Sequence, residues 1–243
     1  MTTGILRVIG VGPGDPELMT LKAARLCKAA DIVAYFAKRG EAGHARAIAA
    51  GQIRADCEEI RLEYPLTTEI PAHDPRYRRA IAAFYEASAS RLAGALGEGR
   101  DVALLCEGDP IFYGSGLHLL ERLGPQFATE IVPGVSGMSG CWARARLPLL
   151  RGSETLAVLP ATLDAPALAA KLATADGAVI LKLGRNLGKV RAVLEAAGRL
   201  DDAVYVERGT MAGECIMPLA ARDPAAPAPY FSLLILAARG HGR

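Results

Sequence analysis

Hydrophobic and polar positions divide the first half of the chain into two kinds of segment. Short apolar runs, typical of strands buried on both faces, end in glycine, proline or acidic residues, and longer segments between them have helical periodicity. The pattern predicts strands at 5–11, 32–36, 102–106 and 129–132, and helices at 20–30, 76–96 and 116–123. This alternation is typical of right-handed βαβ units built around a mainly parallel sheet.

The pattern begins again after Pro148. It predicts strands at 155–159, 178–183, 204–206 and 230–237, and helices at 165–174 and 187–197. Two proline-rich stretches, 65–75 and 223–229, predict loops before a helix and before the last strand. We therefore expect an α/β fold with two α/β domains, residues 1–134 and residues 135–243.

Composition excludes several classes of protein. The 243 residues suffice for one large or two small domains, and the 51% of hydrophobic residues are interrupted by charges before any run reaches the ~20 apolar residues that span a membrane. A formal net charge of +2 with mixed signs argues against a nucleic-acid partner. The first twelve residues resemble a strand more than a secretion signal, so a cytoplasmic protein with no membrane contact is expected.

Cysteine and histidine spacing gives no framework for a disulfide scaffold or a zinc site. The cysteines number five and stand singly, and the histidines number four with no pair at zinc-ligand spacing. We expect reduced thiols and no protein-bound metal. The residues concerned are Cys27, Cys57, Cys106, Cys141, Cys215, His44, His73, His118 and His241.

Three loops rich in small residues are the candidates for a ligand site. Each follows a predicted strand: GVGPGDPELMT at 10–20, EGDPIFYGSG at 107–116 and VPGVSGMSG at 132–140. In a parallel sheet such loops lie at one edge, where glycine lets the backbone approach a ligand. Each loop also has an ordinary structural interpretation as a strand-to-helix turn, and Asp109 before Pro110 is a good helix N-cap.

The first loop differs from a dinucleotide-binding fingerprint. Asp15 stands where the third glycine is needed, and Ala37, Lys38 and Arg39 stand where an acidic residue would end the second strand. An NAD-linked oxidoreductase is therefore disfavoured.

Taken together and in this order, the three loops resemble the motifs of the tetrapyrrole (corrin/porphyrin) methyltransferase family. The family patterns are GxGPGDxxLxT, a central GDP followed by an aromatic residue and glycine, and PGxS/T, and the match runs over nearly the whole chain. CEGDPIFYGS, LAVLPATL, VILKLGR and PYFSLLILA resemble the precorrin-2 branch more closely than the uroporphyrinogen branch. The resemblance implies a homodimer with the class III S-adenosylmethionine methyltransferase fold, in which the cofactor lies in the cleft between the two domains.

The resemblance also implies a reaction: transfer of a methyl group from S-adenosylmethionine to carbon 20 of precorrin-2, giving precorrin-3A, in cobalamin biosynthesis. Cobalt-factor II and other corrinoids are alternative substrates. Relatives that modify ribosomal RNA or a diphthamide precursor are disfavoured by the mild charge and the FYGS sequence. A non-catalytic tetrapyrrole-binding module is disfavoured because it would not need the cofactor loops.

Motif position implies which residues contact the cofactor. Leu183 stands where several relatives carry Met, and Gly137 where they often carry Ala. The full set is Pro13, Gly108, Asp109, Phe112, Ser136, Gly137, Leu183 and Gly209.

The reaction depends more on positioning of the donor and acceptor than on reactive side chains, because the methyl donor is already activated. A base that removes a proton after methyl addition would still help, and Asp109, Glu107 and Tyr113 are the catalytic candidates. For Tyr113 the alternative is a packed aromatic ring with a satisfied hydroxyl. Carboxylates on the substrate call for cations, of which the candidates are Arg39, Arg78, Arg79, Arg144, Arg146, Lys182 and Arg185.

Overall fold

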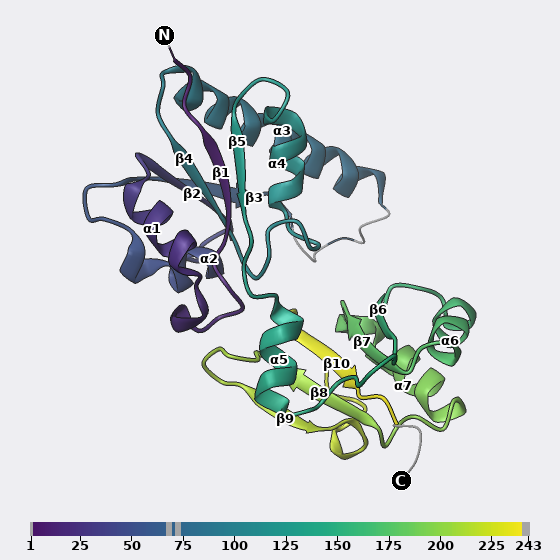
Figure 1. Cartoon of the computed structure of the whole chain (residues 1–243). Coiled ribbons are helices and arrows are strands. Elements are labelled where there is room, and N and C mark those ends of the chain that lie inside the picture. Colours follow the sequence, from purple (N-terminus) through teal and green to yellow (C-terminus); the bar gives the residue numbers. More distant parts are fainter. Residues whose placement is uncertain (1, 67–69, 71–73, 240–243) are drawn as a thin grey trace. The chain divides into compact units, whose positions relative to one another are not determined.

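The chain folds into two compact units, Met1–Gly137 and Met138–Arg243, in a computed structural model. The structure describes residues 2–66, 70 and 74–239, so part of the proline-rich segment 65–75, together with His73 and His241, lies outside the described residues. Each unit is an α/β sandwich around its own five-stranded sheet (Figure 1). The α/β fold expected from the pattern is confirmed.

The sheet of the first unit is parallel throughout, with strand order β3-β2-β4-β1-β5. β1 lies between β4 and β5, with Leu6 opposite both Val102 and Thr129. Every strand therefore ends at the same edge. The strands are β1 (Leu6–Gly10), β2 (Ile32–Lys38), β3 (Glu58–Tyr64), β4 (Val102–Cys106) and β5 (Thr129–Val132).

Helices cover both faces of this sheet, which explains the uninterrupted apolar runs. Figure 1 shows α1 and α2 on one side and α3 and α4 on the other. In β4, Val102, Leu104 and Cys106 pack in the cluster that contains α3 and α4, whereas Ala103 and Leu105 pack in the cluster that contains α1 and α2. The helices are α1 (Leu21–Ala29), α2 (His44–Ile48), α3 (Pro75–Gly97) and α4 (Gly116–Leu123).

Capping residues in the sequence fix where two of these helices begin. The Thr20 side chain accepts a hydrogen bond from the backbone N–H of Ala23 at 3.1 Å, and α1 begins at the next residue. Asp74 accepts from the N–H of Arg76 at 2.8 Å, with Pro75 in the first helical position. Both helices lie within a residue or two of the predicted ranges.

The second unit has a mixed sheet with strand order β6-β7-β10-β8-β9. β6 and β7 are parallel, and β10 runs antiparallel to both of its neighbours and is buried along its whole length. β7 and β8 therefore point the same way, and their carboxyl ends lie at one edge. The strands are β6 (Leu156–Pro160), β7 (Gly177–Leu181), β8 (Ala203–Glu207), β9 (Cys215–Pro218) and β10 (Ser232–Leu236).

Helices also cover both faces of the second sheet. α6 and α7 pack against one face, with Ile180 and Tyr205 in their cluster, and α5 packs against the other, with Val179 and Val206. The helices are α5 (Gly137–Ala145), α6 (Ala165–Ala173) and α7 (Leu187–Ala196).

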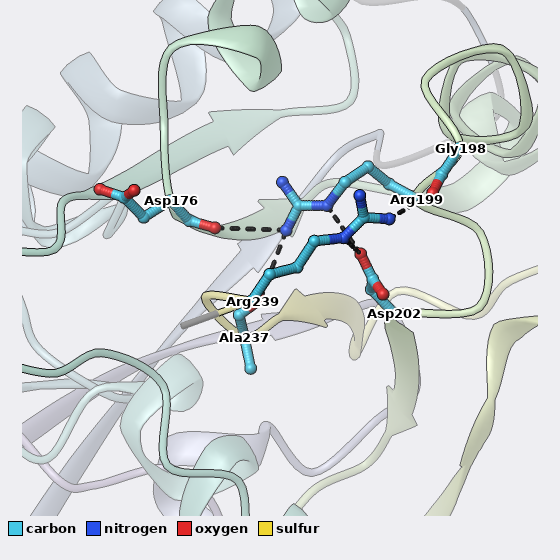
Figure 2. Close-up of polar contacts among 6 residues, drawn as sticks. All are labelled: Asp176, Gly198, Arg199, Asp202, Ala237 and Arg239. Atoms are coloured by element: carbon cyan, nitrogen blue, oxygen red, sulfur yellow. Dashed lines mark hydrogen bonds and ion pairs between the residues drawn. The ribbon is translucent and has the colours of Figure 1, made fainter. Parts of the chain in front are cut away.

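A polar network joins the segments at the edge where β7 and β8 begin and β10 ends. Asp202 accepts hydrogen bonds from Arg199 at 2.9 Å and from Arg239 at 2.6 Å, as Figure 2 shows. The other end of the Arg199 guanidinium donates to the carbonyl oxygens of Asp176 and Ala237, at 3.2 and 3.3 Å. The network ties three chain segments together at the edge opposite the carboxyl ends of β7 and β8.

Three further observations concern the described part of the chain. It contains no helix long and apolar enough to cross a membrane. Its histidine, cysteine and acidic side chains form no group of three or more that could hold a metal ion. All five cysteines are free thiols.

Candidate active site

Backbone contacts between glycines join the three candidate loops at the carboxyl edge of the first sheet. Gly12 and Gly108 form an isolated antiparallel bridge, in which Gly108 N–H donates to the Gly12 carbonyl at 2.7 Å. A Cβ at Gly134 would lie 2.2 Å from the Gly108 oxygen, and one at Gly10 would lie 2.6 Å from the same atom. The loops after β1, β4 and β5 therefore converge, and we call this meeting of Gly10, Gly12, Gly108 and Gly134 the glycine junction.

Asp109 ties the second loop to the third. One of its carboxylate oxygens accepts from the N–H of Ile111 at 3.1 Å, and the other accepts from the N–H of Gly134 at 3.3 Å. The first contact closes a local turn, and the N-cap interpretation of Asp109 is wrong because the next helix, α4, begins only at Gly116. The second contact spans 25 residues. Asp109 thus shapes the second loop with one oxygen and ties that loop to the third with the other.

The first and third loops are shaped in different ways. In the first, Pro13 is buried and Asp15 accepts from the N–H of Glu17 at 2.9 Å, which starts a short 3-10 turn. The Asp15 carboxylate therefore serves the local fold. In the third, Ser136 is half-buried, and Gly137 is exposed, with nothing within 4 Å of the position that a Cβ would take.

The two other proton-transfer candidates flank Asp109. Glu107 is exposed, yet the surrounding protein desolvates its carboxyl enough to raise the pKa, against the opposing influence of His44 and the Ala45 N–H. Tyr113 is 52% exposed, and its ring meets that of Phe112 edge to face at 4.9 Å. Its φ of 56° lies in the left-handed region that bulky residues rarely adopt.

A side chain from β3 holds the end of the second loop. The hydroxyl of Tyr64, the last residue of β3, lies 2.6 Å from Ser115 Oγ, just before α4. The Tyr64 ring stacks on Phe36 with centroids 5.6 Å apart. No local sequence pattern indicates this contact, because the two hydrogen-bonded residues are 51 positions apart.

Leu183 and Gly209 lie beyond the carboxyl ends of β7 and β8 in the second unit. Leu183 is 1% exposed, and Gly209 is also buried. A Cβ on Gly209 would lie 2.5 Å from the sulfur of Cys141, so glycine is needed for close packing on α5. The flanking residues Arg208 and Thr210 both have positive φ, at 50° and 69°.

Glu214 fixes the segment that carries Gly209. Its carboxylate accepts from the N–H of Thr210 at 2.7 Å and pairs with Arg144 at 2.7 Å. The hydrogen bond from Arg144 lowers the pKa of Glu214 below its ordinary value. The hydroxyl of Thr210 is buried without a hydrogen-bond partner in the described part of the chain. Sequence reasoning had selected Gly209 but missed Thr210, which adjoins it.

All seven cations selected from the sequence are exposed. Arg144 is engaged by Glu214, and Arg39 lies 3.9 Å from Glu63. The first unit contributes Arg39, Arg78 and Arg79, and the second contributes Arg144, Arg146, Lys182 and Arg185.

The fold and these loops together define a class of protein. The structure superposes with a TM-score of 0.67 on uroporphyrin-III C-methyltransferase from Thermus thermophilus, solved in complex with S-adenosylhomocysteine, at 24% identity over 96% of this chain and 97% of that one. The fold is therefore that of the class III methyltransferases.

Sequence comparison identifies the family. The family model of the tetrapyrrole (corrin/porphyrin) methylases matches residues 6–223, and the chain belongs to this family. It is 50% identical to precorrin-2 C(20)-methyltransferase of Sinorhizobium sp. over 235 residues, which cover 96% of both chains. It is 28% identical, again over 96% of both chains, to cobalt-precorrin-2 C(20)-methyltransferase of Salmonella typhimurium. The family resemblance of the three loops is confirmed.

Proposed function

We propose that this protein transfers the methyl group of S-adenosylmethionine to carbon 20 of precorrin-2, giving precorrin-3A in cobalamin biosynthesis. The observation that carries the proposal is the 50% identity to precorrin-2 C(20)-methyltransferase along 96% of both chains. The more distant cobalt-precorrin-2 relative, at 28% identity, makes the cobalt-containing substrate the second candidate.

The described residues suit the methyl donor. Gly108, with φ of 64°, turns the backbone at the glycine junction, and the space beside Gly137 is open where a side chain would otherwise stand. In the second unit, the buried Thr210 hydroxyl is an unsatisfied group that a polar ligand would satisfy. The proposed contacts are Pro13, Gly108, Asp109, Phe112, Ser136, Gly137, Leu183 and Gly209.

Once bound, S-adenosylmethionine supplies a methyl group already activated by its sulfonium. Transfer forms a carbon–carbon bond at carbon 20, breaks the carbon–sulfur bond of the donor, and leaves a proton on carbon 20 to be removed. Among the three candidates, Glu107 has a raised pKa because of desolvation, and a carboxylate with a higher pKa is a stronger proton acceptor. Both oxygens of Asp109 are engaged by backbone N–H groups, which suits it to holding the loops. Tyr113 is better placed to contact ligand with its exposed ring.

A cytoplasmic homodimer that uses no protein-bound metal, nucleic acid or membrane completes the proposal. The family resemblance supports the dimer. Light scattering of the purified protein should give twice the chain mass, and a monomeric mass would refute this part alone.

The proposal is tested with two acceptors side by side. Purified protein is incubated anaerobically with S-adenosylmethionine and either precorrin-2 or cobalt-factor II, and product mass and S-adenosylhomocysteine are followed over time. We expect one methyl group per tetrapyrrole and a higher kcat/KM with the metal-free acceptor. Faster transfer to cobalt-factor II would instead assign the cobalt-containing tetrapyrrole as the substrate. Transfer to neither acceptor would refute the proposal.

A further inference from the structure

A row of cations follows the ends of two strands in the second unit. Lys182 comes directly after β7, and Arg208 directly after β8. Both strands flank β10, where Leu234 lies opposite Ile180 and Tyr205. Extending that register places Lys182 and Arg208 at neighbouring levels, two strand spacings or roughly 10 Å apart.

A third cation joins this row from the connection between β7 and α7. Arg185 lies in a short 3-10 turn, Gly184–Asn186, three residues beyond Lys182. We call Lys182, Arg185 and Arg208 the cationic edge.

The backbone at this edge is poorly suited to the side chains it carries. φ is 59° at Lys182 and 50° at Arg208, in the left-handed region that glycine and asparagine adopt more readily than residues with long side chains. Strain of this kind is found where a site requires a particular side chain or backbone shape. Both positions carry long cationic side chains, although glycine or asparagine would fit this backbone conformation better.

The acidic residues near Arg185 and Arg208 are engaged elsewhere. Glu214 is paired with Arg144, and Glu207 accepts a hydrogen bond from the Tyr205 hydroxyl at 2.8 Å. The guanidinium groups of Arg185 and Arg208 are exposed, and no hydrogen bond or ion pair to either is found within residues 2–66, 70 and 74–239. Two guanidinium groups therefore remain available for an anionic ligand.

An aromatic side chain lies at the same edge. Tyr230, two residues before β10, is 80% exposed, and its ring meets that of Phe231 edge to face at 5.0 Å. The N–H of Arg208 donates to the Phe231 carbonyl at 2.8 Å, so the aromatic pair and Arg208 are joined through the backbone. Exposed cations next to an exposed aromatic ring match a flat apolar ring system bordered by carboxylates.

We propose that Arg185 and Arg208 bind the acetate and propionate carboxylates of the tetrapyrrole and so select polycarboxylate acceptors. This inference rests on the proposed function. It adds Arg208, which motif reasoning had not selected, and within the second unit it favours Arg185 over Arg144, whose charge is already engaged.

The test separates acceptor binding from donor binding. Arg185→Gln and Arg208→Gln are compared with wild type for the KM of precorrin-2 and, by calorimetry, for the Kd of S-adenosylhomocysteine. We expect each variant to raise the acceptor KM by about ten-fold, the typical effect of losing one charge-assisted contact, and to leave the Kd unchanged. Arg208→Lys should recover part of the loss, since it restores charge without the planar fork.

Arg151→Gln and Lys171→Gln are matched controls, because both residues are exposed cations of the second unit at other positions and the change in net charge is the same. They should keep the wild-type KM. If they raise the KM as much as the edge variants, a general field effect explains the result and the proposal is overturned. A parallel loss of S-adenosylhomocysteine affinity in the edge variants would overturn it too, by assigning the cations to the donor.

A binding assay keeps the inference separate from the reaction. Uroporphyrin, a stable tetrapyrrole with acetate and propionate arms, is titrated against wild type and Arg208→Gln by fluorescence, without any methyl donor. Weaker binding by the variant supports the cationic edge even if wild type transfers no methyl group to precorrin-2. Equal binding overturns it even if transfer is normal.

Arg208→Asn provides a second readout. Asparagine tolerates the left-handed backbone, so this variant should unfold at a higher temperature than Arg208→Gln while having the same weak uroporphyrin binding. Wild-type binding by Arg208→Asn would show that the Arg208 side chain contributes nothing to the ligand.

Discussion

Glycine at the junction is required by contact distances that the sequence motif alone does not show. The Gly108 oxygen is approached by both Gly10 and Gly134, so any side chain at either position would press against backbone that three loops share. Backbone of this kind cannot move aside as the end of a flexible side chain can. Substitutions here should therefore affect folding and donor binding together.

Gly134→Ala tests the junction at its tightest point. A Cβ 2.2 Å from the Gly108 oxygen should lower the free energy of unfolding by roughly 2 kcal/mol or more and weaken S-adenosylhomocysteine binding. Urea unfolding and calorimetry measure the two effects. Gly94→Ala is the control: Gly94 lies inside α3 with nothing within 4 Å of its Cβ position, so alanine should stabilise the protein by up to about 1 kcal/mol. A Gly134→Ala variant as stable as wild type would contradict the close packing.

Glu214 should make stability depend on pH. Its hydrogen bond from Arg144 holds the folded-state pKa below the unfolded-state value of about 4.3. The contribution of the carboxylate is therefore fully present above about pH 4.3 and is lost as pH falls through the lowered pKa. Wild type should exceed Glu214→Gln in melting temperature near pH 7, and the difference should shrink below about pH 4. Because Arg144 is mostly exposed, we expect the ion pair to contribute no more than about 1 kcal/mol to the free energy of unfolding. A difference that does not change with pH would contradict the ion pair.

Sequence reasoning at the residue scale found the glycines and Asp109 because their motifs are local. It missed the Tyr64–Ser115 contact, the Thr210 hydroxyl and the left-handed Arg208. The first depends on residues far apart in the chain, and the other two depend on how the segment after β8 packs against α5. The proton-transfer role of Glu107 stays a prediction.

At the scale of elements, most strands were predictable, including the edge strands β5 and β6, whereas the edge strands β3 and β9 were not. β4 and β5 begin and end where the apolar runs predicted. β3, with the sequence EEIRLEY, lies at the edge of its sheet and buries only Ile60 and Leu62 fully. Its charged residues interrupt the apolar run by which a strand is recognised in the sequence. β9 is likewise an edge strand, of four residues, and α2 has five residues, too few for a clear helical period.

The contact between β3 and the start of α4 should position the second loop. Tyr64→Phe removes the hydroxyl that meets Ser115 Oγ and keeps the stacked ring. We expect a loss of about 1 kcal/mol in unfolding free energy and a few-fold loss in kcat/KM, because the loop ahead of Ser115 gains freedom. Tyr85→Phe is the control, since Tyr85 belongs to the same aromatic cluster and no hydrogen bond of its hydroxyl is found among the described residues. Equal kcat/KM for the two variants would contradict a positioning role.

The network in Figure 2 should stabilise the second unit without contributing to the site. Asp202→Asn weakens two charge-assisted hydrogen bonds, from Arg199 and Arg239, and should cost about 1–3 kcal/mol in urea unfolding. The KM for the acceptor should not change in the fraction that stays folded. Asp201→Asn, a change at the neighbouring exposed residue, is the control and should have the same unfolding free energy as wild type. Equal stability of the two variants would show that the network contributes little.

At the scale of the whole chain, the order of the motifs was more informative than any one of them. Each loop alone has a structural interpretation, but the three in sequence match a family whose model covers residues 6–223. The parallel sheet then explains the order, because β1, β4 and β5 are neighbours although the chain separates them widely. The antiparallel β10 inserted between β7 and β8 was not predictable, since strand order is set by contacts between segments distant in the chain.

The proposed function depends on the transfer of one methyl group to carbon 20. We would supply ¹³C-methyl-labelled S-adenosylmethionine and anaerobically prepared precorrin-2 to the purified protein and locate the label in the product by NMR. We expect a single labelled methyl group on carbon 20 and one S-adenosylhomocysteine released for each product formed. A label on any other ring carbon, or S-adenosylmethionine left intact beside unreacted precorrin-2, would show that the proposed reaction is wrong.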